Sequence, residues 1–138
     1  MSLPTSIADG TVQFPKAYIR SVTTAIAATT TTAICTPDLF RLFRVDRAEL
    51  IVDATYLVDP ANYYVFTLQA GATVIATWST LTGQQGTLTA NVPATMVLTA
   101  TDLNRVVPLG VPLTLVATKN GAAANVQPTI AVHGRTVN

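Results

Sequence analysis

The stretch VPLTLVAT, from Val111 to Thr118, places an apolar side chain at every second position. In a β-strand, successive side chains point to opposite faces of the sheet. Four apolar residues therefore share one side of the predicted strand, namely Val111, Leu113, Leu115 and Ala117. This alternation predicts a strand that rests one face on a hydrophobic core.

Asn120 and Gly121 follow this strand almost directly. Both residue types tolerate the positive φ angles that a tight hairpin turn requires. The next apolar segment, VQPTIAVH from Val126 to His133, alternates again. We therefore predict a hairpin between the two strands, with a loop lengthened by the AAAN insertion.

The same alternation, with an apolar residue at every second position, occurs upstream. In RAELIVDATYL, residues 47–57, the apolar positions share one side of a predicted half-buried strand: Ala48, Leu50, Val52, Ala54 and Tyr56. The tetrapeptide Asp59-Pro60-Ala61-Asn62 predicts a turn, because aspartate favours its first position and proline its second. NYYVFTLQ and TVIATWS then form a second predicted hairpin around Ala70-Gly71.

Turn signals every eight to twelve residues are typical of an antiparallel sandwich or barrel. We therefore expect an all-β, single-domain antiparallel β-sandwich of about eight strands over residues 17–138. Residues 1–16 lack periodicity and contain Pro4, Gly10 and Pro15, which predicts an extended N-terminal arm.

The composition of the 138-residue chain is apolar and poor in charge. Hydrophobic residues make up 49% and charged residues 11%, against about 25% charged residues in typical soluble domains. No apolar run approaches the roughly 18 residues of a membrane-spanning helix, so we expect no membrane partner. A weakly charged surface loses little hydration when it meets another protein, which favours obligate assembly over a threonine-covered monomer.

Few residues are suited to catalysis, metal binding or phosphate binding. The net charge of +1 gives no field to recruit nucleic acid. A histidine cluster for metal is impossible, since His133 is alone, and Cys35 has no partner for an internal disulfide. Glycine-rich phosphate loops and nucleophile elbows are missing. We therefore expect a protein that is not an enzyme and binds no cofactor or metal.

One stretch is different. LFRLFRVDRAEL, residues 39–50, holds five charged side chains of a chain with eight Lys or Arg and seven Asp or Glu. Its spacing suggests a loop or one helical turn leading into a strand at Arg47. The open alternatives are surface ion pairs, a protein interface, a nucleic-acid contact, and a catalytic pair of Glu49 with Asp53. For the interface the candidate residues are Arg41, Arg44, Asp46, Arg47, Glu49 and Asp53, with Arg44 and Arg47 paired to the carboxylates.

With the strands placed, residues 47–134 show a family likeness. The run from Arg47 to Thr80, a glycine-bearing loop, and the run from Asp102 to Gly134 resemble the jelly-roll proteins that decorate tailed-bacteriophage heads, called decoration or cement proteins. The late passage with Val107, Gly110, Leu113 and Gly121 carries part of this resemblance.

The resemblance implies a jelly-roll structural protein on the capsid exterior of the virion. It would be made in the host cytoplasm, assemble as a homotrimer and bind the major capsid protein of the shell. The N-terminal arm is our candidate for a shell-contacting segment. Two other functions stay open: a receptor- or glycan-binding head of a fibre or spike, with Tyr63 and Tyr64 exposed, and a hydrolase using His133, Glu49 and Asp53.

Overall fold

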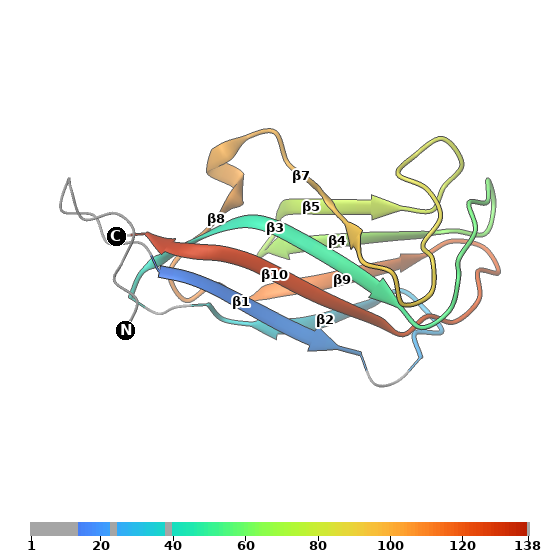
Figure 1. The fold of residues 1–138 in the computed structure, drawn as a ribbon, viewed down its shortest axis with the longest axis horizontal. Coiled ribbons are helices and arrows are strands. Elements are labelled where there is room, and N and C mark those ends of the chain that lie inside the picture. Colours follow the sequence, from blue (N-terminus) through green and yellow to red (C-terminus); the bar gives the residue numbers. More distant parts are fainter. Residues whose placement is uncertain (1–13, 23–24, 38–39, 138) are drawn as a thin grey trace.

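The structure is a computed structural model that describes residues 14–22, 25–37 and 40–137. Two antiparallel sheets pack face to face as a sandwich (Figure 1). The first sheet has the strand order β1 (Phe14–Ser21), β10 (Pro128–Val137), β3 (Leu42–Val52) and β6 (Ala94–Thr95), with β8 (Val106–Val107) also paired to β3. The second has the order β2 (Thr30–Cys35), β9 (Leu113–Lys119), β4 (Tyr64–Ala70), β5 (Thr73–Ser79) and β7 (Val97–Leu98).

The strand order is that of a jelly roll. Strand β1 pairs with β10, β2 with β9, β3 with β6 and β8, and β4 with β5. The first half of the chain thus runs antiparallel to the second half, as one long hairpin folded over into two layers. The expected all-β sandwich is confirmed. Its described residues form ten strands, three of them only two residues long, and a 3₁₀ helix, η1 (Asp102–Arg105).

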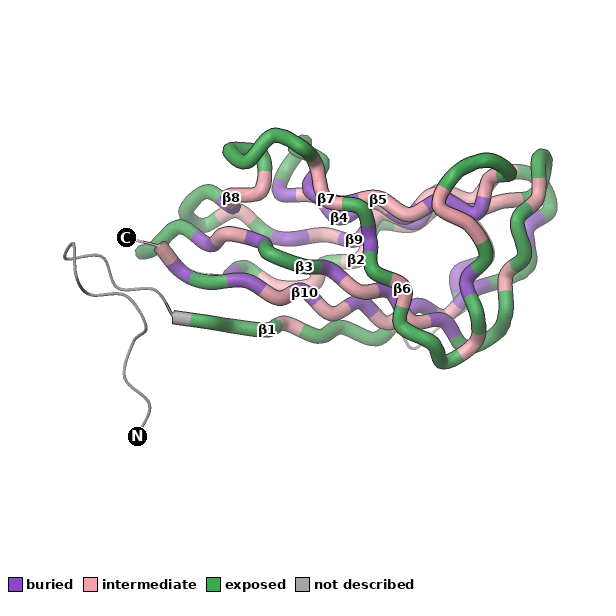
Figure 2. The backbone as a smooth tube through the Cα atoms, turned by 45° about the horizontal axis from the view of Figure 1, so that its top comes forward, coloured by how far each residue is buried: buried purple, intermediate pink, exposed green. Residues whose placement is uncertain are grey.

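The hydrophobic core fills the space between the two sheets. Figure 2 shows buried positions alternating with mostly half-buried ones along β3 and β10. The largest fully buried side chains are Tyr64, Phe43, Phe66, Leu50, Leu68 and Ile75. Tyr64 keeps its hydroxyl satisfied by donating to the carbonyl of Ile26 at 3.1 Å.

Two local predictions are confirmed in detail. In β9, Leu113, Leu115 and Ala117 are buried, as their alternation predicts. The hairpin of β4 and β5 also forms, although its register shifts after Leu68, so that Ile75 rather than Val74 enters the core. The turn after Tyr56 forms as well.

In that turn, the backbone N–H groups of Ala61 and Asn62 each donate to Asp59 Oδ1 at 2.7 Å. These hydrogen bonds, the one from Ala61 first, lower the pKa of the Asp59 carboxyl. The carboxylate is therefore the form that holds this turn.

The predicted hairpin between the strands at 111–118 and 126–133 is wrong. β9 belongs to the second sheet and β10 to the first. Gly121 does adopt a positive φ of 62°, but the loop crosses from one layer to the other. A Cβ on Gly121 would lie 2.4 Å from the carbonyl oxygen of Ala61, so the turn packs against a neighbouring loop.

The predicted loop or helical turn before Arg47 is also wrong, because β3 already begins at Leu42. In β3, Val45 lies opposite Gly134 and Arg47 lies opposite His133, which leaves Asp46 as the extra residue of a β-bulge. Phe43 and Val45 therefore face the core before the bulge, and Ala48, Leu50 and Val52 face the core beyond it. Because of this change of phase, the apolar residues of β3 do not keep a strict period of two, and the alternation pattern does not predict the whole strand.

At the N-terminus, β1 begins at Phe14. Residues 14–16, which we assigned to the arm, are therefore part of the first sheet. The remainder of the predicted arm, residues 1–13, lies outside the described residues.

Gly134 makes the close approach of β10 to β3 possible. A Cβ at this position would lie 2.0 Å from the carbonyl oxygen of Arg44 and 2.7 Å from Cζ of Phe43. Since the obstructing atoms include backbone, a side chain would push the two strands apart at the bulge.

We expect Gly134→Ala to destabilise the fold by about 1–3 kcal/mol, the usual range for overpacking. Urea unfolding followed by the fluorescence of Trp78 measures the change. Ala131→Ser, on the outward face of the same strand, is the matched control. A Gly134→Ala protein as stable as the control would contradict the close contact.

Two buried threonines differ in how their hydroxyls are satisfied. Thr80 Oγ1 accepts a hydrogen bond from the backbone N–H of Tyr64 at 3.0 Å. Thr136 is fully buried, and its Oγ1 has no hydrogen-bond partner among the described residues. Burying a hydroxyl without a partner is unfavourable.

Valine has nearly the shape of threonine, so the two sites predict opposite effects. We expect Thr136→Val to raise the free energy of unfolding by up to about 1 kcal/mol, and Thr80→Val to lower it by about 1–3 kcal/mol. Thermal unfolding of both variants beside the wild type tests this. Equal destabilisation by the two substitutions would show that Thr136 is satisfied.

Candidate interaction surface

The charged stretch of the sequence forms the outer face of the first sheet. Because of the bulge at Asp46, both Asp46 and Arg47 point outward, and Arg44 and Glu49 lie on the same face. Four charged side chains from one strand thus line one side of the sandwich.

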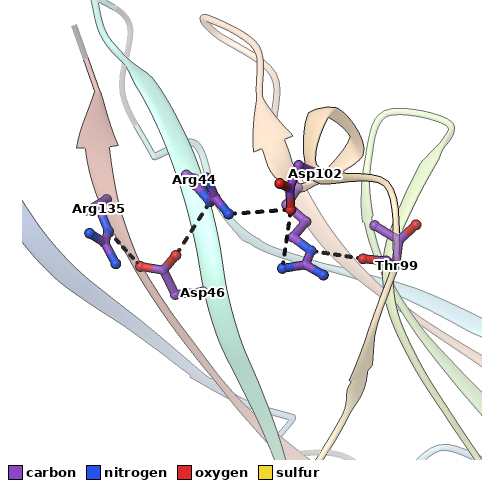
Figure 3. A network of polar contacts seen from close by, with 6 residues as sticks. Arg44, Asp46, Thr99, Asp102 and Arg135 are labelled. Atoms are coloured by element: carbon purple, nitrogen blue, oxygen red, sulfur yellow. Dashed lines mark hydrogen bonds and ion pairs between the residues drawn. The ribbon is translucent and has the colours of Figure 1, made fainter.

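A chain of ion pairs joins β3 to strand β10 on one side and to the helix η1 on the other (Figure 3). Asp46 accepts from Arg135 Nε of β10 at 2.8 Å and lies 3.6 Å from Arg44 Nε. The other end of the Arg44 guanidinium reaches Asp102 of η1 at 3.4 Å. Asp102 also lies 3.6 Å from Arg105, whose Nε donates to the carbonyl of Thr99 at 2.8 Å. The network therefore ties β10, β3 and η1 together across the surface.

A second, smaller group lies beyond the bulge. Glu49 Oε1 lies 2.9 Å from Arg47 Nε and 3.4 Å from His133 Nε2. The predicted pairing of Arg44 and Arg47 with Asp46 and Glu49 is thus observed within one chain. His133 lies on the outer face of β10, beside Glu49.

Asp53 does not belong to either group. It lies just past the end of β3 and accepts from the backbone N–H of Gln127 at 3.0 Å and from the Tyr56 hydroxyl at 3.4 Å. Desolvation, followed by the negative charge of Asp53, raises the pKa of Tyr56 to about 12. Asp53 therefore stabilises the loops at one end of the sandwich, and the structure gives it no shared site with Glu49.

Sequence reasoning missed three members of this surface. Asp102, Arg105 and Arg135 are far from the charged stretch in the chain: Arg135 is 89 residues from Asp46, and Asp102 is 58 residues from Arg44. Only the pairing of β10 with β3 and the position of η1 bring them together. Arg41, the first predicted interface residue, is exposed directly before β3.

The outer face of the second sheet, unlike that of the first, presents uncharged side chains. Its outward side chains are threonine, valine, alanine and one glutamine: Thr31, Ala33, Val65, Thr67, Gln69, Val74, Thr77, Val97, Thr114, Val116 and Thr118. Lys119, at the end of β9, is the one charged residue among the five described strands of this sheet. Its Nζ donates to the carbonyl of Ala27 at 3.1 Å, away from the centre of the face.

The remaining candidates lie mostly in the core. Tyr64 is 1% exposed, so the predicted pair of exposed tyrosines for a glycan-binding head is wrong for this residue, and Tyr63 is half-buried. Trp78 packs against the core and donates to the carbonyl of Gly86 at 3.2 Å. Burial raises the pKa of the half-buried Cys35 to about 11, which keeps it a neutral thiol at physiological pH.

Two further observations concern the described part of the chain. Within residues 14–22, 25–37 and 40–137, no three His, Cys, Asp or Glu side chains gather as a metal site would require. Over the same ranges, no helix is long and apolar enough to cross a bilayer.

Comparison with known proteins gives little. No protein-family model matches the chain, and no curated protein sequence matches it. Among solved structures, the chain is similar to one titled "Structure of infectious bursal disease virus Gx strain", with 16% identity and a TM-score of 0.32. The match covers 89% of this chain and 35% of that one, so this chain spans about a third of its length. A TM-score of this size carries no argument about fold or function.

The ion pairs on the first sheet lie in water-accessible positions. The side chains of Arg44, Asp46 and Arg135 are 39%, 33% and 47% exposed. We therefore expect Asp46→Asn to lower the free energy of unfolding by no more than about 1 kcal/mol, as for other exposed ion pairs.

The difference between the wild type and Asp46→Asn is expected to shrink in molar sodium chloride, which screens exposed charges. Urea unfolding at low and high salt measures it. A loss of several kcal/mol that salt does not alter would show that the network is a buried structural element.

Proposed function

We propose that this protein is a structural virion protein that binds the outer surface of an assembled phage capsid and stabilises the shell, as decoration or cement proteins do. The partner is the major capsid protein of the shell, and more than one copy of the chain acts together. The jelly-roll sandwich and the sequence resemblance over residues 47–134 support this proposal.

The observation that carries the proposal is the division of the surface into two faces of different chemistry. The first sheet presents ion pairs that are already matched within the chain, and the second presents hydroxyl and aliphatic groups without charge. Such a molecule offers two broad sheet surfaces for neighbouring proteins. Polar surfaces of this kind are typical of protein contacts, whereas small-molecule sites are mostly apolar.

The charged face of the first sheet is the proposed contact with the shell. The side chain of Arg47 is 55% exposed, so its guanidinium group lies within reach of carboxylates on a partner. Mixed charges at an interface fix orientation and register more than they add affinity. A protein that must sit at one defined place on a lattice of subunits requires this kind of contact.

Binding of this kind stabilises a shell without any reaction. A protein that binds only the assembled lattice shifts the equilibrium toward it by mass action. Linked copies add avidity, because contacts of modest strength act together when the geometry lets all of them form.

Co-sedimentation with undecorated, expanded phage heads tests the proposal. We expect the wild-type protein to pellet with the heads at micromolar concentration. Arg47→Glu, which reverses a charge on the first sheet, should bind at least about tenfold more weakly, because it sets like charges against the partner. Lys119→Glu, at the end of the second sheet, is the matched control and should bind like the wild type.

Failure of the wild-type protein to pellet with any expanded heads would overturn the proposed function. Equal binding by wild type and Arg47→Glu would remove the charged face from the contact, while the decoration role itself would stand.

A further inference from the structure

The fold sorts the charged residues of its strands onto one layer. Strands β1, β3 and β10 of the first sheet contain all but one of the strand residues that bear charge: Lys16, Arg20, Arg44, Asp46, Arg47, Glu49 and Arg135. The second sheet has only Lys119, at the end of β9. A chain with little charge thus leaves one whole sheet without any on its outer face.

The uncharged outer face of the second sheet exposes apolar side chains and an unprotected strand edge to water. The centre of the face is the cross-strand row of Val65, Thr67, Val116 and Thr118, and exposed valines border it, with Val74 42% and Val97 54% exposed. Its edge strand β2 has the sequence TTTAIC, without charge or proline. Charged residues and prolines are what normally keep sheet edges from associating.

Covering this face removes no charge from water, so its desolvation is inexpensive. The partner must be equally free of charge, because a charged group opposite this face would be buried without a counter-ion. The described structure contains one surface of matching extent and chemistry: the same sheet on another copy of the chain.

The area is sufficient for a specific contact. Four strands about 4.8 Å apart, each of about seven residues at 3.4 Å, give a flat footprint of roughly 450 Å² per copy. Two such faces together approach the lower limit of roughly 1,000 Å² for specific interfaces. This estimate leaves out the additional surface area of the protruding side chains.

We infer that the outer face of the sheet β2-β9-β4-β5-β7 is the surface through which copies of this chain associate with one another. The charged first sheet then faces outward from the oligomer. The inference concerns the protein in the absence of any shell, and it does not depend on the proposed function.

Sedimentation velocity of the purified full-length protein tests the inference. At tens of micromolar we expect a species heavier than the 14.5 kDa monomer, and we expect it to persist in molar sodium chloride, because no charge pairs hold it. A charge placed at the centre of the face, in Thr67→Lys or Val116→Lys, should weaken association at least about tenfold.

Thr129→Lys and Ala131→Lys are the matched controls, since they place the same charge at outward positions of β10 on the first sheet. Both should associate like the wild type. Far-ultraviolet circular dichroism shows whether each variant is folded. The milder Thr67→Asn, which keeps the face uncharged and should leave association intact, separates an effect of charge from an effect of any substitution at this position.

Three results would overturn the inference. The first is a wild-type monomer at all concentrations. The second is an oligomer that dissociates in salt, which would place the charged sheet at the interface. The third is an oligomer that folded Thr67→Lys and Val116→Lys variants leave intact. Each of these results leaves shell binding to be decided by its own experiment.

Discussion

The contact between β10 and β3 at Gly134 is the constraint on which the rest of the structure depends. Because Gly134 has no side chain, β10 lies close against the carbonyl of Arg44, and β3 accommodates one extra residue at Asp46. The bulge turns Phe43 and Val45 toward the core on one side of Asp46 and Ala48 on the other. Without this change of phase, one half of the strand would expose its apolar side chains and bury its charges.

The same bulge creates the charged surface. It sets Asp46 and Arg47 side by side on the outer face, where Asp46 reaches Arg135 and Glu49 reaches Arg47. The ion pairs are individually weak because they are exposed to water. Their contribution lies in orientation: they hold the guanidinium groups of two strands and of η1 in fixed positions on a rigid sheet.

The two faces together suit an assembling protein. Internally matched charges on one sheet and an uncharged second sheet allow the molecule to meet two kinds of neighbour without burying an unpaired ion. Jelly-roll topology supports this division, since the chain alternates between layers and can place charged and uncharged strands on opposite sides. The sandwich supplies rigidity, and its outer faces are the surfaces that we propose as contacts.

The sequence by itself determined the all-β class and the inner face of strands with a regular alternation, such as β9. Alternation identified Leu113, Leu115 and Ala117, and the turn signals at Asp59 and Gly71 were correct, because both depend on interactions between residues close in the chain. It also identified the pairing of Arg44 and Arg47 with neighbouring carboxylates, which are within reach on the same strand.

Only the tertiary structure decided which strands share a sheet. The Asn120-Gly121 signal identifies the positive φ of Gly121 but not the layer that the next strand enters, so the predicted hairpin failed. Asp102, Arg105 and Arg135 joined the surface through pairing across the length of the chain, and the uncharged face arose because five charge-poor strands from different parts of the chain were placed in one layer. Long-range strand pairing is set by the packing of the whole core, and a local sequence pattern does not determine it.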